Sequence, residues 1–316
     1  MKRHIKHLAL LMVLVGAIGC STQPKPAENP VALFTEPSIY HWKTTFETDS
    51  TSLNFLRQHD IKRIYLRMFD IAFERQEVNP IATTRFSSPI PEGIEVVPVV
   101  YITIDALREM KGKEAEYAEL IVNRVEAMCN YNKLGTIGEL QFDCDWTTTT
   151  KHSYTLLCGE AKRILEERGV DLSITVRLHQ LAETPPPADR GVLMLYNMGA
   201  IKNRQTRNSI LDIEDAKPYL QKNHRYPIPL AYAYPTFGWG VRFYGDSFDA
   251  IVSEQDKVYG SGYIRWERAT ADEILEVKAL VEQRLGKPSY GNIIYHLDNS
   301  QLNHYTHDEI SQMLCY

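Results

Sequence analysis

The sequence predicts a single α/β domain, an irregular (β/α)8 barrel of the TIM type with long βα loops. Short β-rich runs alternate with helical patterns from Ser38 onward, and eight such runs can be counted. Several of them, such as residues 96–102 and 192–196, are almost continuously apolar. Continuous apolar runs suit strands that are covered on both faces, as in parallel sheets. Eight alternating units in a chain of 316 residues argue for one barrel rather than two domains.

The elements follow one another in a regular order. The expected strands are residues 39–44, 63–69, 95–103, 138–146, 172–178, 192–197, 228–234 and 292–297. The expected helices are residues 52–59, 114–131, 153–168, 213–222, 271–285 and 308–314. Helices after the second, fifth and seventh strands are poorly formed, so the barrel is irregular. An open doubly wound sheet is the alternative, but no Gly-rich nucleotide-binding motif follows any strand, and no cofactor is expected.

The charge balance argues against a nucleic-acid partner. The chain has 35 basic and 40 acidic residues and a formal charge of −5. It therefore has no excess of Lys and Arg with which to neutralise a phosphate backbone.

The N-terminus has the order of a secretory signal. Basic residues precede an apolar run over residues 8–15, and small residues follow up to Cys20. The end of this segment resembles a bacterial lipobox, which implies cleavage after residue 19 and a lipid on Cys20. We expect a signal peptide over 1–19, a lipidated Cys20 with a Pro-rich tether over 20–36, and the barrel over 37–316. The protein would then be exported to the cell envelope and anchored to a bacterial membrane, in our expectation the outer membrane.

Removal of the signal would make the protein more acidic. It takes away three of the 35 basic residues and none of the 40 acidic ones, so the formal charge changes from −5 to −8. Four cysteines remain beyond Cys20, none of them at the spacing of a metal site. Each is expected to be a small buried hydrophobic residue, and no metal ligand set is predicted from them. These residues are Cys129, Cys144, Cys158 and Cys315.

The fourth strand carries the strongest chemical signal. Strand side chains alternate, so Gln141, Asp143 and Asp145 point to one side of the strand and the apolar residues between them to the other. If the apolar set faces the helices, the polar set faces the barrel axis. Two carboxylates about 7 Å apart on one strand raise each other's pKa, which suits an acid that must stay protonated. Asp143 and Asp145 are therefore the predicted catalytic pair. In the alternative, Asp145 caps the next helix or both acids bind a structural Arg.

Residues 142–147, Phe-Asp-Cys-Asp-Trp-Thr, resemble the D-x-D-x-E signature of family-18 chitinase-like glycoside hydrolases. In the usual register Asp143 and Asp145 match the two aspartates, and Thr147 stands where the resemblance puts the general acid Glu. A shift of two residues would instead place Asp145 on the acid. The Q-x-D-x-D pattern is also similar to a group of uncharacterised bacterial barrel proteins, which fits the second register. The resemblance implies a barrel that acts on or binds carbohydrate.

Other strand ends supply partners of the type that sugars need. Aromatic faces stack on sugar rings, and carboxylates and amides bind hydroxyl groups. The resemblance matches Tyr196 to a Tyr that assists the acetamido group of the substrate. Residues 235–244 are expected to form a long βα loop over the barrel mouth. The predicted substrate-binding residues are Gln141, Tyr101, Tyr196, Tyr232, Tyr234, Trp239 and Asp298.

Three functions stay open at this point. The first is a glycosidase that uses Asp143 and Asp145. The second is a non-catalytic glycan-binding or scaffold lipoprotein, because Thr147 replaces the acid. The third is a metal-dependent hydrolase, in which some of His179, His296, His304 and His307 join the two acids. The sequence leaves the oligomeric state, the glycan and the linkage open.

Overall fold

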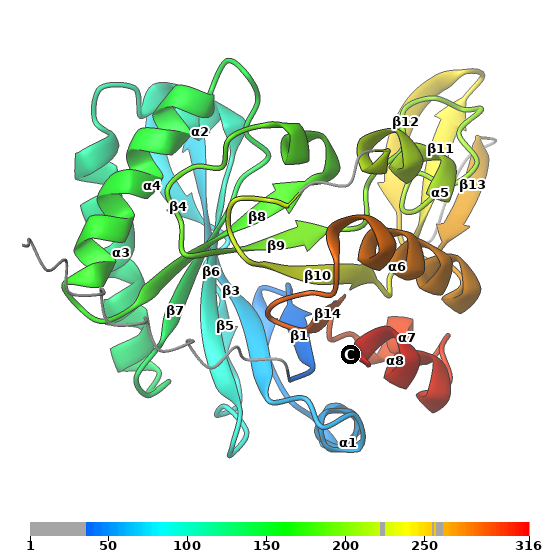
Figure 1. The fold of residues 1–316 in the computed structure, drawn as a ribbon, viewed down its shortest axis with the longest axis horizontal. Helices are drawn as coiled ribbons and strands as arrows, with labels where there is room; N and C mark the ends of the chain where they lie inside the picture. The colour runs from blue at the N-terminus through cyan, green and yellow to red at the C-terminus, as the bar shows by residue number, and fades with distance from the viewer. Residues whose placement is uncertain (1–35, 222–224, 255, 257–261, 316) are drawn as a thin grey trace, which may run out of the picture. The chain divides into compact units, whose positions relative to one another are not determined.

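The computed structural model describes residues 36–221, 225–254, 256 and 262–315. Within them, eight parallel strands close into a barrel, because β1 pairs with β14 on one side and with β3 on the other (Figure 1). The predicted (β/α)8 barrel is confirmed, and all eight predicted strands are present. In chain order the barrel strands are β1 (Ser38–His41), β3 (Arg63–Glu74), β6 (Glu95–Ile102), β7 (Glu139–Asp143), β8 (Asp171–Arg177), β9 (Arg190–Met194), β10 (Leu230–Pro235) and β14 (Asn292–Tyr295).

The helices lie between the strands, and the predicted helices 114–131 and 271–285 match α3 and α6 residue for residue. The predicted helix 213–222 divides into a short α-helix and a 3-10 turn, because Pro218 has no N–H to continue the helical ladder. The helices are α1 (Ser50–Gln58), α2 (Ile104–Glu109), α3 (Glu114–Tyr131), α4 (Lys151–Glu166), α5 (Ile213–Ala216), α6 (Ala271–Leu285), α7 (Asn299–Leu302) and α8 (His307–Leu314), with 3-10 turns η1 (Leu178–Ala182) and η2 (Lys217–Leu220).

The barrel is irregular where the sequence indicated. After the second barrel strand the chain returns as the antiparallel strand β4 (Glu77–Ile81), and the short strands β2 (Thr45–Phe46) and β5 (Arg85–Phe86) pair with each other. After the fifth strand only η1 precedes the next strand.

The expected loop over residues 235–244 is wrong. This segment contains β11 (Gly238–Tyr244), which forms a three-stranded antiparallel sheet with β12 (Ser247–Val252) and β13 (Tyr263–Arg268) beside α5 and α6 (Figure 1). The glycines that suggested a loop permit close packing of the sheet: a Cβ on Gly240 would lie 2.8 Å from side-chain atoms of Trp266 and Val252. The alternation of Trp239, Val241 and Phe243 was the strand signal.

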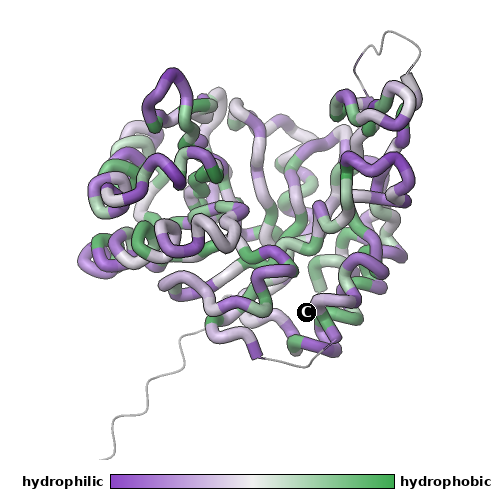
Figure 2. The backbone as a smooth tube through the Cα atoms, turned by 90° about the horizontal axis from the view of Figure 1, so that it is seen from above, coloured by the Kyte–Doolittle hydropathy of each residue, from purple (hydrophilic) through white to green (hydrophobic). Residues whose placement is uncertain are grey.

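The core follows the strands and the inner faces of the helices. Figure 2 shows hydrophobic segments along the central strands and mainly hydrophilic ones along the outer helices and loops. Three of the cysteines, Cys129, Cys144 and Cys158, are free thiols buried in this core, as expected. Cys315 is exposed, so its predicted burial is wrong; it follows the last turn of α8, at the end of the described chain.

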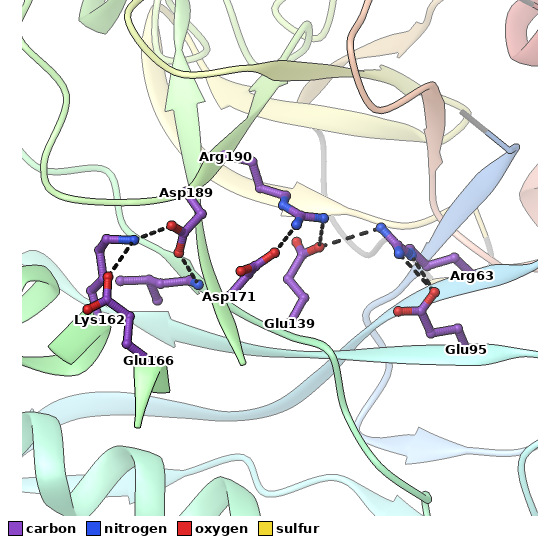
Figure 3. Close-up of polar contacts among 9 residues, drawn as sticks. Arg63, Glu95, Glu139, Lys162, Glu166, Asp171, Asp189 and Arg190 are labelled. Atoms are coloured by element: carbon purple, nitrogen blue, oxygen red, sulfur yellow. Dashed lines mark hydrogen bonds and ion pairs between the residues drawn. The ribbon is translucent and has the colours of Figure 1, made fainter. Parts of the chain in front are cut away.

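Ion pairs close the amino end of the barrel (Figure 3). The Glu139 carboxylate is 1% exposed and lies 3.5 Å from a guanidinium nitrogen of Arg63 and 3.1 Å from one of Arg190. Arg63 also binds Glu95 at 2.8 Å, and Arg190 binds Asp171. A buried carboxylate is costly without such partners, so this group of ion pairs has a structural role at the amino end of the barrel axis.

Residues Phe34–Tyr316 form one compact unit. The predicted signal peptide, Cys20 and the tether up to residue 35 lie outside the described residues. Of the helices in the described ranges, none combines the length and the apolar character that a bilayer crossing requires.

Candidate functional site

The polar face of β7 points into the barrel. Gln141 is fully buried and accepts a hydrogen bond of 2.6 Å from the Tyr40 hydroxyl on β1, and its amide reaches Ser173 on β8. Phe142, on the other face, is buried, and its carbonyl accepts a bond from Tyr154 on α4. The alternation expected for this strand is therefore correct, and it directs Asp143 and Asp145 to the carboxyl end of the barrel.

Asp145 is held by an arginine from the neighbouring strand. Arg177, at the end of β8, donates from Nε to Oδ1 at 2.5 Å and from Nη2 to Oδ2 at 3.1 Å. Its third nitrogen, Nη1, donates to the Tyr196 carbonyl at 3.3 Å. A guanidinium that engages both oxygens stabilises the ionised carboxylate and fixes its orientation. Both oxygens of Asp145 are therefore engaged, and its carboxyl group has a fixed orientation.

Asp143 is more deeply buried than Asp145. It is 4% exposed and accepts a hydrogen bond of 2.7 Å from the Thr175 hydroxyl. Burial raises its pKa to about 6, and the charge of Asp145 adds to the rise, while Arg177 and the Thr175 bond oppose it. The charge of Asp145 therefore adds to the effect of burial on the pKa of Asp143, in the direction expected for two acids on one strand.

Thr147 lies at the turn that leads into α4. Its backbone N–H donates to the Thr150 hydroxyl at 2.9 Å, and its own hydroxyl lies 2.9 Å from that of Thr149. The side chain is exposed and carries no carboxyl group. The position to which the resemblance assigns the general acid therefore offers only a hydroxyl.

Five aromatic rings form a continuous row across the carboxyl ends of the strands. The Trp42 ring centroid lies 6.4 Å from that of Tyr101 and 5.6 Å from that of Tyr295. Phe237 lies 5.5 Å from Tyr295 and 5.1 Å from Trp239. We call these five residues the aromatic row. All of its members except Phe237 are partly exposed, so the row can offer ring faces to a ligand.

The aromatic row lies beside the acids. Burial raises the pKa of Tyr101 to about 12, and the negative charges of Asp145 and Asp143 add to it. The pKa of Tyr295 is also raised, first by burial and then by the charge of Asp143. Both phenols therefore stay neutral and can donate hydrogen bonds at physiological pH.

A cavity of about 310 Å³ opens next to Asp145 and Arg177. Its other lining residues include His179, Asn197 and Tyr219. Tyr196 also lines it, with its ring 5.0 Å from that of Tyr295, and its buried hydroxyl has no hydrogen-bond partner in the described part of the chain. The cavity thus combines aromatic rings with a carboxylate, an amide and an unsatisfied hydroxyl.

Trp239 is fixed by the small antiparallel sheet. Its indole N–H donates to Glu267 at 2.8 Å, and Glu267 is also bound by Ser209 and Arg265 at 2.5 Å each. The sheet therefore orients one end of the aromatic row.

Solved structures share this architecture at low sequence identity. A chitinase from Chromobacterium violaceum aligns with a TM-score of 0.54 over 89% of this chain and 99% of its own, at 12% identity. A chitinase from Bacteroides thetaiotaomicron aligns with a TM-score of 0.55 over 89% and 97%, at 9% identity. The chain has the fold of a chitinase-like barrel. The spore cortex-lytic enzyme SleL of Bacillus cereus aligns with a TM-score of 0.51 over 87% and 75%, at 14% identity. No family model and no curated protein sequence matches the chain.

Three predicted residues of this chitinase-like barrel are not among those that line the cavity beside Asp145. Tyr232 and Tyr234 face away from the axis: Tyr232 donates to the Gly286 carbonyl after α6, and the Tyr234 ring lies 5.8 Å from the Lys278 ammonium on α6. Strand β10 alternates Tyr with Ala, and the alanines take the crowded interior. Asp298 caps α7 and pairs with Lys43 at 3.1 Å in a separate cavity of about 520 Å³. Their assignment to the acid site is therefore wrong.

Three members of the aromatic row, Trp42, Tyr295 and Phe237, were not among the predicted site residues. Tyr295 contacts five other rings, and four of these contacts are with residues far from it in the chain, which no local pattern reveals. The candidate histidines also separate: His304 lies 3.5 Å from Glu254, and His307 stacks on His59. Across the described residues, no three His, Cys, Asp or Glu side chains are placed to hold one metal ion.

Proposed function

We propose that this chain binds a glycan at the carboxyl end of its barrel and does not hydrolyse it. One observation carries the proposal: Arg177 engages both oxygens of Asp145, while Thr147 stands where the resembling hydrolases place their acid. Glycoside hydrolysis needs a carboxylic acid that protonates the leaving oxygen. Both oxygens of Asp145 are occupied by the Arg177 guanidinium, and a threonine hydroxyl has no suitable proton to give.

The aromatic row supports a sugar as the ligand. Its partly exposed rings offer apolar faces, and the hydroxyls of Tyr101 and Tyr196, Asn197 and the fixed carboxylate of Asp145 lie at the same end of the barrel. Sugar rings present C–H faces to aromatics and hydroxyls to polar groups. A chitinase of Ostrinia furnacalis with this fold was crystallised with an N-acetylglucosamine oligomer. We therefore propose a glycan that contains N-acetylglucosamine.

The proposed place of action is the cell envelope. The signal-like N-terminus and the lipobox-like Cys20 support export and a lipid anchor, with the outer membrane as the site of attachment. A tethered glycan-binding barrel would hold its ligand close to the membrane surface.

The test combines binding with product analysis. Calorimetric titration with chitopentaose and with peptidoglycan fragments should give saturable binding, and mass spectrometry after long incubation should give unchanged oligosaccharide. A chitinase of the same fold, under the same conditions, is the control for cleavage. Absence of binding to any glycan tested would remove the proposal, and released short products would replace binding by hydrolysis.

Hydrolysis is the second candidate, because the pKa of Asp143 is raised to about 6. An acid in this range can donate a proton near neutral pH. If the wild type releases products, Asp143→Asn should abolish the release. Turnover that persists in this variant would exclude Asp143 as the acid.

A further inference from the structure

A second cavity lies at the opposite end of the barrel from the acids. Its volume is about 580 Å³, larger than that of the cavity beside Asp145. It is formed by the segment that enters β10 and by the turn between α6 and β14. Parallel strands start at the same end of a barrel, so this cavity opens at the amino end. Its lining residues are Arg225, Tyr226, Pro227, Ile228, Pro229, Leu230, Tyr232, Arg284, Leu285, Gly286, Lys287 and Ser289.

The charge of this cavity has one sign. Arg225, Arg284 and Lys287 line it, and among the described residues that line it none is Asp or Glu. In the described part of the chain, neither Arg225 nor Arg284 forms an ion pair, although most other arginines of the protein do. The protein as a whole is acidic, so a concentration of unpaired guanidinium groups is unusual for it. It marks a place where an anion is attracted.

Arg284 carries a specific sign of a missing partner. Its Nε is buried and has no hydrogen-bond acceptor among the described residues. Buried donors are almost always satisfied, so an orphan N–H beside a cavity indicates an acceptor that comes from outside the chain. A guanidinium presents its N–H groups in a planar fork that matches two oxygens of a phosphate.

Apolar side chains line another part of the cavity, beside Ser289 and the two tyrosines. Pro227, Ile228, Pro229, Leu230 and Leu285 provide hydrocarbon surface next to the cations. A small inorganic anion would leave most of this surface uncovered. A phosphate that carries an organic group would use both the cationic and the apolar parts.

We infer that this cavity binds a phosphate ester. Arg225 and Arg284 would donate hydrogen bonds to the phosphate oxygens, and the apolar side chains from Pro227 to Leu230, together with Leu285, would contact the attached organic group. The source is either a phospholipid headgroup or a soluble phosphate ester. Strand β1 begins at Ser38, so the chain enters the barrel at this same end. If Cys20 is lipidated, the 17 residues between it and Ser38 span at most about 60 Å, which keeps this end within reach of lipid headgroups.

The experiment titrates the full chain with glycerol 3-phosphate and, separately, with vesicles of phosphatidylcholine with and without phosphatidylglycerol. The variants are Arg225→Gln, Arg284→Gln and the two combined. Arg57→Gln is the matched control, because it removes the same charge from an exposed position at the end of α1 that leads to the amino end of β3. All chains share the same N-terminal segment, so its own affinity for membranes cancels in the comparison.

We expect saturable binding of glycerol 3-phosphate by the wild type, a dissociation constant raised at least about tenfold in the double variant, and no change in Arg57→Gln. Arg225 is exposed, so its single variant remains informative if Arg284→Gln fails to fold. No saturable binding, or binding that is unchanged in the double variant, would overturn the inference.

The measurements with vesicles distinguish a phospholipid headgroup from a soluble phosphate ester as the ligand. If binding to phosphatidylglycerol vesicles falls in the double variant and not in Arg57→Gln, the headgroup is the ligand. If it falls equally in both while glycerol 3-phosphate binding depends only on Arg225 and Arg284, the ligand is a soluble ester. Chitopentaose binding serves as an independent readout and should be unchanged in every variant.

Discussion

Arg177 donates two hydrogen bonds to Asp145, one to each carboxylate oxygen, across two adjacent barrel strands. The Asp145 side chain is 38% exposed and that of Arg177 17% exposed, so the pair lies between a surface salt bridge and a buried one. The bond geometry gives the pair an orientation that a single contact would not.

This pair should be measurable as a coupling in stability. Arg177→Met should lower the free energy of unfolding by about 1–3 kcal/mol, because it leaves Asp145 without its partner in a partly buried place. Adding Asp145→Asn should recover part of that loss, since the unpaired charge is then absent. Urea denaturation of the two single variants and the double variant measures the coupling. Strictly additive losses would show that the two side chains do not stabilise each other.

The raised pKa of Asp143 predicts a dependence of stability on pH. The folded protein holds the proton up to about pH 6, whereas the unfolded chain loses it near pH 4. The folded state therefore binds more protons in this window, and the contribution of Asp143 to stability falls as the pH rises from about 4 to 6. The loss is on the order of 2 to 3 kcal/mol.

Asp143→Asn should remove this loss, because Asn still accepts the Thr175 bond and cannot ionise. The measurement is the difference in unfolding free energy between pH 4.5 and pH 7.5 in the wild type and in the variant. Comparing differences cancels the contributions of all other titrating groups. An identical pH dependence in both proteins would contradict the raised pKa.

If the aromatic row binds the glycan, a substitution in the row should weaken glycan binding and a substitution outside it should not. Trp239→Ala should weaken chitopentaose binding by about tenfold, roughly 1.4 kcal/mol, because a stacking face disappears. Trp239→Phe should retain most of the affinity, since the ring remains and only the bond to Glu267 is lost. Tyr232→Phe is the control, because Tyr232 faces α6. Titration calorimetry on the three variants decides, and equal affinity in all three would remove Trp239 from the site.

The ion pairs at the amino end of the barrel predict a large and local loss of stability. Glu139→Ala should cost about 3 kcal/mol or more, because Arg63 and Arg190 both lose a carboxylate partner that is 1% exposed. Glu166→Gln is the comparison: it removes a carboxylate that pairs with Lys162 on α4 and is 61% exposed, and it should change stability by less than about 0.5 kcal/mol. Thermal and urea unfolding measure both. Similar effects in the two variants would mean that burial does not decide the cost.

Hydrophobic periodicity and strand alternation within single segments were sufficient to predict several helix bounds and side-chain directions. The helix 114–131 was bounded correctly because its periodicity and flanking residues lie within one segment. The inward direction of Gln141, Asp143 and Asp145 followed from strand alternation, since the apolar residues between them had only one suitable environment. Strand β10 does not alternate polar with apolar residues. Its tyrosines and its alanines both suit a protein interior, so the sequence does not indicate which of the two residue types faces the barrel axis.

The sequence by itself determined that eight strands alternate with helices and that two acids stand at the end of the fourth, because these patterns repeat within a few residues. Only the tertiary structure decided that Arg177 holds Asp145, that Lys43 holds Asp298, and that Tyr295 joins Trp42 to Phe237. The partners of these contacts lie from 32 to more than 200 positions apart in the chain. The closure of the barrel brings them together, and no local spacing records which of the available charges and rings will meet.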